Sequence, residues 1–557
     1  MTLRILGSFI LAMFTFPLYG ADRTAAEGKK GMVVCVSPDA AEVGVEILKQ
    51  GGNAVDATVA VAFAMAVTYP SAGNIGGGGF MMVLPAKGKE PILIEYRETA
   101  PGIVKRDTFA NEISTLTHKA VGVPGTVRGM ALAHQKFGKL SWKDLLAPSI
   151  KLAEEGFLLT PAMARSLNQT LKRVGKNPEF RRVFARPDGK DWQLGDRLIQ
   201  PDLAKTMKLI AEDGPEAFYT GKIADLLIKE IESGSGYITK EDLKSYRAVE
   251  RKPIHGTYRG YDIFGPSPPS SGGITLIEML NILENFDLKK QDRMSVETQH
   301  LLIESMRRGY LDRARYLGDP EFTKIPEKLI SKEYAKELAK GINSNRATKS
   351  ESLAEDIPLK SESKETTHFS IVDCDGMAVS NTYTLEESYG SQIVVKGGGF
   401  LLNNEMGDFN WKPGITTKTG RIGTAPNEVA PGKRMLSSQT PTILMKDGNL
   451  VLVTGSPGGR TIINTVLNVI VNVVDYEMEI QQAIDFPRTH HQWFPDEVKV
   501  ESIEKFPELV KGLTAKGHQV ITKPYWQGDA HSIWIDPKTG TRRGAVDPRI
   551  DGKGVGY

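Results

Sequence analysis

The distribution of apolar and polar positions divides the chain into segments of different character. Residues 5–18 are almost entirely apolar, and Arg4 precedes them. The small residue Gly20, directly before Ala21, suits a signal-peptidase cleavage site. This order is typical of a secretory signal peptide, and the apolar stretch is short for a membrane span. We therefore assign residues 1–20 to a signal peptide and expect an exported mature chain, in the periplasm of a Gram-negative cell. The alternative is an uncleaved N-terminal anchor.

After this leader, apolar runs and glycine turns predict alternating strands and helices. Residues 32–36 have the pattern of a buried strand, and residues 40–50 that of a helix ended by two glycines. Residues 54–67 are apolar almost all round, as in a helix buried between layers. A four-glycine turn then leads into a strand at residues 80–84. Because it lacks a Lys-Ser/Thr pair and a following helix, this turn is a poor match to a phosphate loop.

The middle of the chain is mostly helical in pattern. It spans residues 140–340 and has one turn-rich break at residues 265–273. Residues 342–365 then shift to Ser, Lys, Glu and Asn with few apolar positions. That composition predicts an exposed, mobile loop, which ends abruptly at Thr366.

Strand patterns dominate after Thr366. Residues 367–373 and 377–384 alternate on either side of a tight turn, which indicates a hairpin. Residues 440–446 and 450–454 form a further strand pair. Helices and strands in both halves predict one layered α+β domain built from two segments of the chain.

Composition narrows the class of protein without identifying it. Of the 557 residues, 40% are hydrophobic and 25% charged, and the net charge of +3 indicates neither a nucleic-acid nor a membrane-surface partner. No later segment is apolar for long enough to cross a bilayer, so we expect no membrane span in the mature form. Cys35 and Cys374 are the only cysteines, and we expect them unpaired. No Cys/His cluster has zinc spacing, and we expect neither a metal nor a cofactor.

The predicted hairpin brings two hydroxyl groups within reach of each other. Its turn places Thr366, at the start of the first strand, opposite Thr384 or its neighbour. Cross-strand partners have Cβ atoms about 4.5–5.5 Å apart, so the two hydroxyls could share a hydrogen bond. The alternative is a hairpin in which both threonines serve only as strand formers.

A glycine turn further along the chain offers backbone donors. The stretch Gly455-Ser456-Pro457-Gly458-Gly459-Arg460 lies between a strand and a strongly apolar helix expected at residues 461–474. Free N–H groups at a helix start bind anions and could stabilise the oxyanion of a tetrahedral intermediate. Such strand-to-helix turns are also common as purely structural features.

Four charged residues suggest recognition of a substrate with both signs of charge. Arg97 follows a strand and could bind a carboxylate through two hydrogen bonds. Glu386, Glu405 and Asp408 lie in turn-like segments and could receive an ammonium group. For each of them the alternative is an ordinary solvated position on the surface.

The order of motifs resembles that of the γ-glutamyltransferase (γ-glutamyltranspeptidase) family along nearly the whole mature length. The resemblance rests on a nucleophile motif, an asparagine pair, a serine pair, a glycine pair and four N-terminal stretches. These stand at Thr366-Thr367-His368, Asn403-Asn404-Glu405, Ser437-Ser438, Gly458-Gly459, and residues 51–57, 73–80, 121–126 and 316–320.

The resemblance implies a four-layer αββα sandwich of the N-terminal-nucleophile hydrolase class. It also implies a proenzyme cleaved between Glu365 and Thr366, which gives a large subunit of residues 21–365 and a small catalytic subunit of residues 366–557. The two chains would remain together as a heterodimer. The new α-amine of Thr366 has a reference pKa of about 7.7–8.0, which suits it to act as the base for its own hydroxyl.

The remaining roles are likewise those that the resemblance implies. Arg97 and Ser437 would hold the α-carboxylate of a γ-glutamyl donor, with Ser438 beside them. Glu386, Glu405 and Asp408 would hold its α-ammonium, Gly458 and Gly459 would form the oxyanion hole, and Thr384 would orient Thr366. Glutathione is the expected donor, and water, amino acids or peptides are the expected acceptors.

Some positions depart from the usual family pattern. Glu386 and Glu405 stand where Asn and Gln are frequent, although acids also occur there. Thr419 stands in the expected lid, residues 409–435, where some members have a gating tyrosine, and Met435 replaces a usual proline. These two changes suggest a looser lid over the site.

Two other functions remain compatible with the motifs. One is a related acylase that acts on a glutaryl-type side chain or on poly-γ-glutamate. A donor without an α-ammonium would leave three acids without a partner, which is unfavourable. The other is a catalytically dead protein that only binds γ-glutamyl compounds, and the presence of Thr366, Thr384 and the glycine pair disfavours it.

Overall fold

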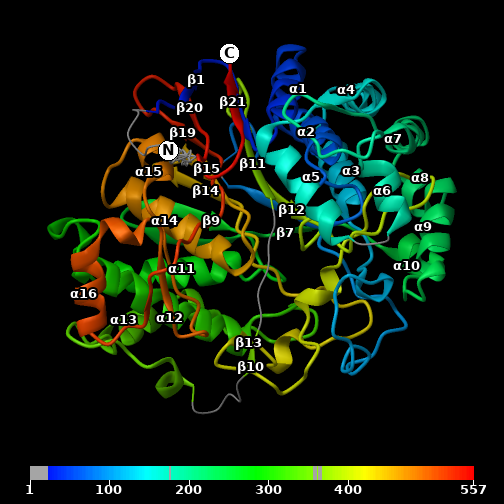
Figure 1. Cartoon of the computed structure of the whole chain (residues 1–557). Coiled ribbons are helices and arrows are strands. Elements are labelled where there is room, and N and C mark those ends of the chain that lie inside the picture. Colours follow the sequence, from blue (N-terminus) through cyan, green and yellow to red (C-terminus); the bar gives the residue numbers. More distant parts are fainter. Residues whose placement is uncertain (1–22, 89, 175–176, 355–359, 362–366) are drawn as a thin grey trace, which may run out of the picture.

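Two sheets, each of seven strands, form the centre of the chain in a computed structural model that describes residues 23–557 except 89, 175–176, 355–359 and 362–366 (Figure 1). In order across sheet I, the strands are β1 (Ala26–Gly28), β20 (Arg542–Ala545), β19 (Ser532–Ile535), β15 (Asn449–Thr454), β14 (Thr442–Lys446), β9 (Tyr261–Gly265) and β8 (Ile254–Tyr258). In order across sheet II, they are β21 (Lys553–Gly556), β2 (Met32–Cys35), β11 (Thr367–Val372), β12 (Ala378–Thr384), β3 (Gly78–Leu84), β4 (Ile92–Glu95) and β7 (Val249–Arg251).

The two sheets pack against each other through one face of each. In β2, Met32 and Val34 point to the space between the sheets, whereas Val33 and Cys35 point to the helices outside. This is the alternation that strand geometry imposes. Side chains from both sheets fill the inner space, among them Phe80, Met82, Leu93, Val372, Phe264, Ile443, Val453 and Ile533.

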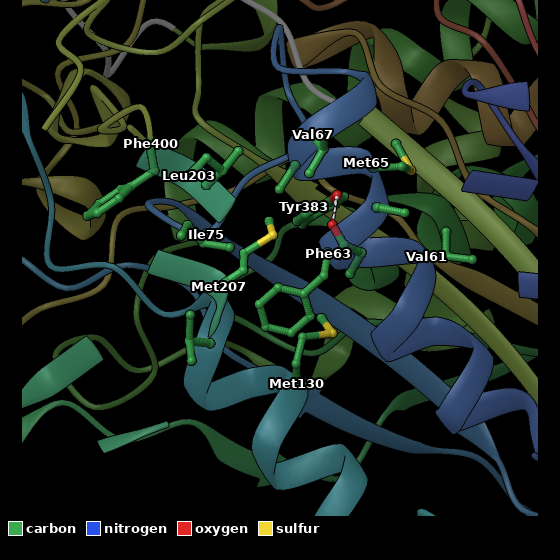
Figure 2. Packing of buried hydrophobic residues seen from close by; sticks show 14 of the residues in the cluster. Val61, Phe63, Met65, Val67, Ile75, Met130, Leu203, Met207, Tyr383 and Phe400 are labelled. Atoms are coloured by element: carbon green, nitrogen blue, oxygen red, sulfur yellow. Dashed lines mark hydrogen bonds between the residues drawn. The ribbon is translucent and has the colours of Figure 1, made fainter. Parts of the chain in front are cut away.

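Helices cover the outer face of sheet II. Helix α2 lies directly on it, and Figure 2 shows Tyr383 of β12 directing its hydroxyl to the carbonyl oxygen of Ala62, at 3.1 Å. Met130 and Met207, from two further helices, pack on the other side of α2, so every residue of that helix is buried. The helices on this side are α1 (Pro38–Lys49), α2 (Ala54–Thr68), α3 (Thr126–Phe137), α4 (Trp142–Glu155), α5 (Pro161–Arg173), α6 (Pro178–Phe184), α7 (Pro201–Asp213), α8 (Glu216–Tyr219), α9 (Lys222–Ser233) and α10 (Lys240–Ser245).

A second group of helices covers the outer face of sheet I (Figure 1). Leu276 and Ile463 pack with Leu444 and Leu452 of the sheet in one apolar cluster. The helices of this group are α11 (Gly272–Leu283), α12 (Val296–Tyr316), α13 (Lys332–Lys340), α14 (Ile462–Val474), α15 (Ile480–Asp485) and α16 (Pro507–Ala515). The order helix, sheet, sheet, helix confirms the predicted four-layer α+β architecture.

The predicted exposed loop at residues 342–365 is wrong for part of its length. Residues 343–346 are exposed, but Ser350 is fully buried in a short 3-10 helix. Its N–H donates to Asp496 at 2.8 Å, and its carbonyl accepts from the Trp493 indole at 3.0 Å. The low apolar content of the segment hid this, because its burial depends on polar partners distant in sequence.

Other predictions have separate outcomes. Cys35 is buried and Cys374 exposed, and neither forms a disulfide, as expected. The signal peptide at residues 1–20 and the junction of Glu365 and Thr366 lie outside the described residues. Within the described part of the chain, no helix has the length and apolar character needed to span a bilayer.

The turn between β11 and β12 is tied to the start of α2 by Asp373. This buried carboxylate accepts hydrogen bonds from the N–H groups of Ala54, Asp375 and Met377 at 2.9–3.0 Å. The Ala54 N–H is one of the groups that a helix start leaves unpaired, so Asp373 fixes α2 against the hairpin.

We expect Asp373→Ala to destabilise the protein by about 2–4 kcal/mol, because it leaves buried backbone donors without an acceptor. Asp375→Ala is the matched control two residues away. Its side chain is 55% exposed and lies 3.4 Å from the Lys139 ammonium, a surface pair that contributes little. Thermal unfolding of both variants measures the difference, and equal midpoints would contradict the role given to Asp373.

Candidate active site

A cavity of about 1040 Å³ opens where β12 ends, next to the loops of residues 403–410 and 436–439. Its volume lies at the upper end of the usual range for small-molecule sites. The predicted site residues that line it are Arg97, Glu386, Glu405, Asp408, Ser437, Ser438 and Gly459. Thr384 and Gly458 lie beside it without lining it, and Thr366 is outside the described residues.

Arg97 is buried and lies among acids. Its Nη2 donates to Asp408 Oδ2 at 2.5 Å, and its Nη1 bonds to Glu405. Burial lowers the pKa of Arg97, but these carboxylates raise it above its ordinary value, so the guanidinium stays charged. The predicted carboxylate-binding group therefore pairs with two of the predicted ammonium-binding groups.

Glu98 is a further acid of this cluster that the sequence reasoning missed. It is fully buried 3.6 Å from Arg97, and neither of its carboxylate oxygens has a hydrogen-bond partner within the described part of the chain. Burial raises its pKa to about 7, and burial likewise raises the pKa of Glu405 although Arg97 opposes this. The only signal for Glu98 in the sequence is its position next to Arg97. That position does not predict a shared site, because neighbouring side chains in an extended chain normally face opposite ways.

The serine pair presents two hydroxyl donors. Ser437 Oγ accepts from the Gln439 N–H at 3.1 Å, and Ser438 Oγ accepts from Arg313 Nη2 at 3.0 Å. Each hydroxyl therefore keeps its own proton for another acceptor. Arg313 was not predicted from the sequence, because it lies inside a helix far from the pair along the chain.

The glycine turn has a backbone conformation that glycine adopts more readily than other residues. Gly458 has φ 126° and Gly459 has φ 55°, both in the region that side chains disfavour. A Cβ on Gly458 would lie 2.4 Å from Thr461 Oγ1, so glycine is needed there for space as well. The N–H groups of both glycines have no acceptor among the described residues. They can donate to a ligand, and their role as an oxyanion hole stays a prediction.

The predicted hairpin is confirmed from Thr367 onward. In the ladder, Thr367 pairs with Tyr383 and Thr384 pairs with Gly78. Thr384 Oγ1 accepts from the Glu386 N–H at 2.7 Å, which leaves its own proton to donate. Glu386 itself has φ 81°, a strained conformation of the kind that concentrates at functional sites. Whether Thr366 faces Thr384 stays a prediction.

His368 is a buried residue that contacts both the hairpin and the glycine turn. Its Nδ1 lies 2.9 Å from Thr382 Oγ1, and its Nε2 lies 3.1 Å from Ser370 Oγ, which donates to the His531 carbonyl oxygen. Burial and the neighbouring His531 hold its pKa well below the ordinary value, so the ring is neutral. A Cβ on Gly455 would lie 2.3 Å from this ring. His368 therefore packs between the hairpin and the glycine turn and sets their separation.

Asn403 joins three loops that form the cavity wall. Its Nδ2 donates to the carbonyl oxygens of Gly76 and Gly122, both at 2.8 Å. Its Oδ1 accepts from the N–H groups of Gly122 and Glu405, at 2.8 and 3.0 Å. All of its hydrogen-bonding capacity is thus used to fix the backbone beside Glu405.

Part of the segment 409–435, the expected lid, lines the cavity, and the segment contacts neighbouring parts of the chain. Trp411 stacks on Phe109 with ring centroids 4.9 Å apart, and Arg460 bonds to the carbonyl oxygen of Gly420. Thr419 bonds to Thr417 within the lid at 3.2 Å. Met435 is buried, and its carbonyl oxygen accepts from Arg97 Nε at 3.3 Å. The predicted looseness of the lid is not tested by these contacts.

One group away from the cavity has side chains that could hold a metal ion. His300, Glu304 and His518 lie close together and are buried. However, His300 Nδ1 lies 2.8 Å from His518 Nε2, and Glu304 is paired with Arg307 and Arg308. These contacts already use the ligand atoms, so the cluster fits a structural network better than a metal site.

Stacked sheets between helices, with a hydroxyl-rich hairpin and a donor turn at one end, define a protein of the N-terminal-nucleophile hydrolase class. A cephalosporin acylase from Bacillus halodurans of known structure is similar, with a TM-score of 0.87, 29% identity and 98% of each chain covered. The family profile described as Gamma-glutamyltranspeptidase matches residues 40–557. The chain therefore belongs to the gamma-glutamyltranspeptidase family.

Two curated relatives span nearly the same length. The glutathione hydrolase proenzyme of Escherichia coli K12 is 45% identical over 538 residues, which cover 95% of this chain and 92% of the relative. The Acylase ACY 1 proenzyme of Pseudomonas sp. SE83 is 36% identical over 552 residues, which cover 96% and 95%. Both relatives are proenzymes, one named as a glutathione hydrolase and the other as an acylase.

We expect Asn403→Ala to destabilise the protein by about 2–4 kcal/mol, because it leaves the buried backbone groups of three loops unpaired. Asn404→Ala is the matched control, since Asn404 is equally buried but accepts one bond, from the Glu387 N–H at 3.1 Å, and its Nδ2 has none. Differential scanning calorimetry compares the two. A larger loss for Asn404→Ala would contradict the role assigned to Asn403.

Proposed function

We propose that this chain is a secreted γ-glutamyltransferase that cuts itself before Thr366 and then cleaves glutathione and related γ-glutamyl compounds. The observation that carries the proposal is the charge arrangement of the cavity. The cavity wall carries the hydroxyl donors of Ser437 and Ser438 together with the acids that gather around Arg97. A free α-amino acid end carries both a carboxylate and an ammonium, so it can exchange partners with this cluster without a net change of charge.

The self-cleavage step needs only groups of the chain. The hydroxyl oxygen of Thr366 attacks the carbonyl carbon of Glu365, and the peptide C–N bond breaks as an ester forms on Thr366. The nitrogen of Thr366 takes up the proton and becomes a free amine. Water then hydrolyses the ester, which gives a carboxylate at Glu365 and restores the hydroxyl. The products are the large chain, residues 21–365, and the small chain, residues 366–557, held together as a heterodimer.

Catalysis then uses the same hydroxyl. The α-amine of Thr366 accepts the hydroxyl proton while the oxygen attacks the γ-carbonyl carbon of the donor. The N–H groups of Gly458 and Gly459 stabilise the oxyanion, and Thr384 orients the nucleophile. The leaving amine takes the proton, and water or the amine of an amino acid or peptide acceptor then displaces the glutamyl group from the ester.

Donor recognition follows from the same charges. Arg97, Ser437 and Ser438 hold the α-carboxylate, while Glu386, Glu405 and Asp408 hold the α-ammonium. A glutaryl-type donor, as for an acylase, lacks the ammonium and would leave buried carboxylates uncompensated. A protein that only binds γ-glutamyl compounds would not need the free N–H groups of the glycine pair. The signal peptide proposed at residues 1–20 directs the proenzyme out of the cytoplasm, most simply to the periplasm.

Self-cleavage makes a direct prediction for the mature protein. On a denaturing gel the wild type should run as two chains, and the smaller should begin Thr366-Thr367-His368 on N-terminal sequencing. Thr366→Ala should remain one chain, because no hydroxyl is available to attack. Thr366→Ser keeps the hydroxyl and should still cleave, more slowly or at a similar rate. A single wild-type chain would contradict the nucleophile assignment and favour the binding-protein alternative.

The pH dependence of donor binding has a defined sign. Because burial raises the pKa of Glu98 to about 7 and raises that of Glu405, the empty site holds protons that an incoming ammonium displaces. Binding is therefore linked to proton release, and affinity rises as pH increases toward and through about 7. Calorimetric titration of the wild type with L-glutamate, in two buffers of different ionisation enthalpy, measures the release. Proton uptake on binding would contradict this account, and Glu98→Gln should reduce the release.

A further inference from the structure

Arg313 is a second guanidinium in the cavity wall, in the last turn of α12. It is 8% exposed and borders the same cavity as Arg97. The two differ in their surroundings, since Arg97 has three carboxylates within 4 Å whereas Arg313 has none among the described residues. Burial lowers the pKa of Arg313, and Tyr310 and the more distant Asp408 oppose this.

The hydrogen bonds of Arg313 fix the serine pair. Its Nε donates to Ser271 Oγ at 2.9 Å, and its Nη2 donates to Ser438 Oγ at 3.0 Å. Ser271 in turn donates to the carbonyl oxygen of Ser437 at 2.6 Å. Arg313 thus fixes the backbone of Ser437 through Ser271. It also donates a hydrogen bond to Ser438 Oγ, which acts as the acceptor. The proton of Ser438 is thereby left to point elsewhere.

A buried cation needs an anion or other polar groups to compensate its charge. A buried cation in a cavity wall that has no acidic partner is therefore a candidate to bind an anion. Arg293 gives the contrast within the same chain, because it too is buried without an acidic partner among the described residues. It donates to Asn472 and Asn468 at 2.7 Å and lies over the rings of Tyr476 and Phe486. Arg293 is compensated inside the core, whereas Arg313 borders open space that an anion can enter.

We propose that Arg313 is a second carboxylate-binding residue of this cavity, which neutralises the donor α-carboxylate and directs the Ser438 hydroxyl toward it. The proposal rests on the proposed function and deepens it. The charge of Arg97 is shared with Glu98, Glu405 and Asp408, so Arg97 alone leaves this part of the cavity without net positive charge. Arg313 supplies that charge on the serine side and so selects donors that carry an α-carboxylate.

The test compares two donors that differ in one group. One is a γ-glutamyl anilide, and the other is the 4-aminobutyryl anilide, which has the same chain and ammonium but no α-carboxylate. Arg313→Met should lower kcat/KM for the γ-glutamyl anilide by about 10- to 100-fold, as expected for the loss of a hydrogen bond to a charged group. The loss should lie mainly in KM, because the contact is present before and during the reaction. The 4-aminobutyryl anilide should be affected little.

Arg293→Met is the matched control, since it removes a buried arginine of the same kind away from the cavity. It should lower the thermal midpoint without changing the preference between the two donors. A double-mutant cycle with Ser438→Ala separates the two actions of Arg313. If part of its effect passes through the Ser438 hydroxyl, Arg313→Met should cost less in the Ser438→Ala background.

Each variant is first checked for cleavage before Thr366. If Arg313→Met remains uncleaved, Arg313→Lys carries the test, because lysine keeps the charge but cannot bond to both serines as arginine does. It should reduce the donor preference by a smaller factor. An unchanged preference in a cleaved variant would overturn the proposal, as would failure of both variants to cleave. No turnover of either donor by the cleaved wild type would instead contradict the proposed function itself.

Discussion

The burial of one guanidinium among several carboxylates is the constraint on which the site depends. Arg97, Glu98 and Glu405 are buried together, Asp408 is partly exposed beside them, and burial raises the pKa of both glutamates. Such a cluster adds little to stability, because desolvation offsets the attraction between its members. It does, however, prepare the cavity for a ligand that brings one charge of each sign. In the proposed function, a free α-amino acid end binds by this exchange of partners.

The two-sheet scaffold keeps these groups at fixed separations. The hairpin of β11 and β12 lies in the middle of sheet II, so backbone pairing on both sides holds the end that points to the cavity. His368 packs beneath the glycine turn, and Asn403 joins the loops that carry Glu405. Neither residue has to touch a ligand. They fix the groups that do, as an enzyme with preorganised donors requires.

Local patterns in the sequence predicted much of this arrangement. The alternation of residues 367–384 predicted a hairpin, and the all-round apolar character of α2 predicted a buried helix. Both were predictable because each pattern depends on neighbours along the chain. Arg313, Ser271 and Ser350 were missed because their partners are distant in sequence. The pairing of Arg97 with Glu405 and Asp408 was also missed, since residue types give charges but not separations. The family motifs supplied the roles of Thr366 and Glu365, which lie outside the described residues.

The most direct test of the central claim is to trap the acyl-enzyme. The cleaved protein is mixed with a γ-glutamyl anilide, quenched in acid within the first turnover, and its two chains are weighed by mass spectrometry. The account predicts that the small chain alone gains the mass of one glutamyl group, and that fragmentation places the group on Thr366. A glutamyl group on another residue, or release of the aniline with no covalent species at any quench time, would contradict it.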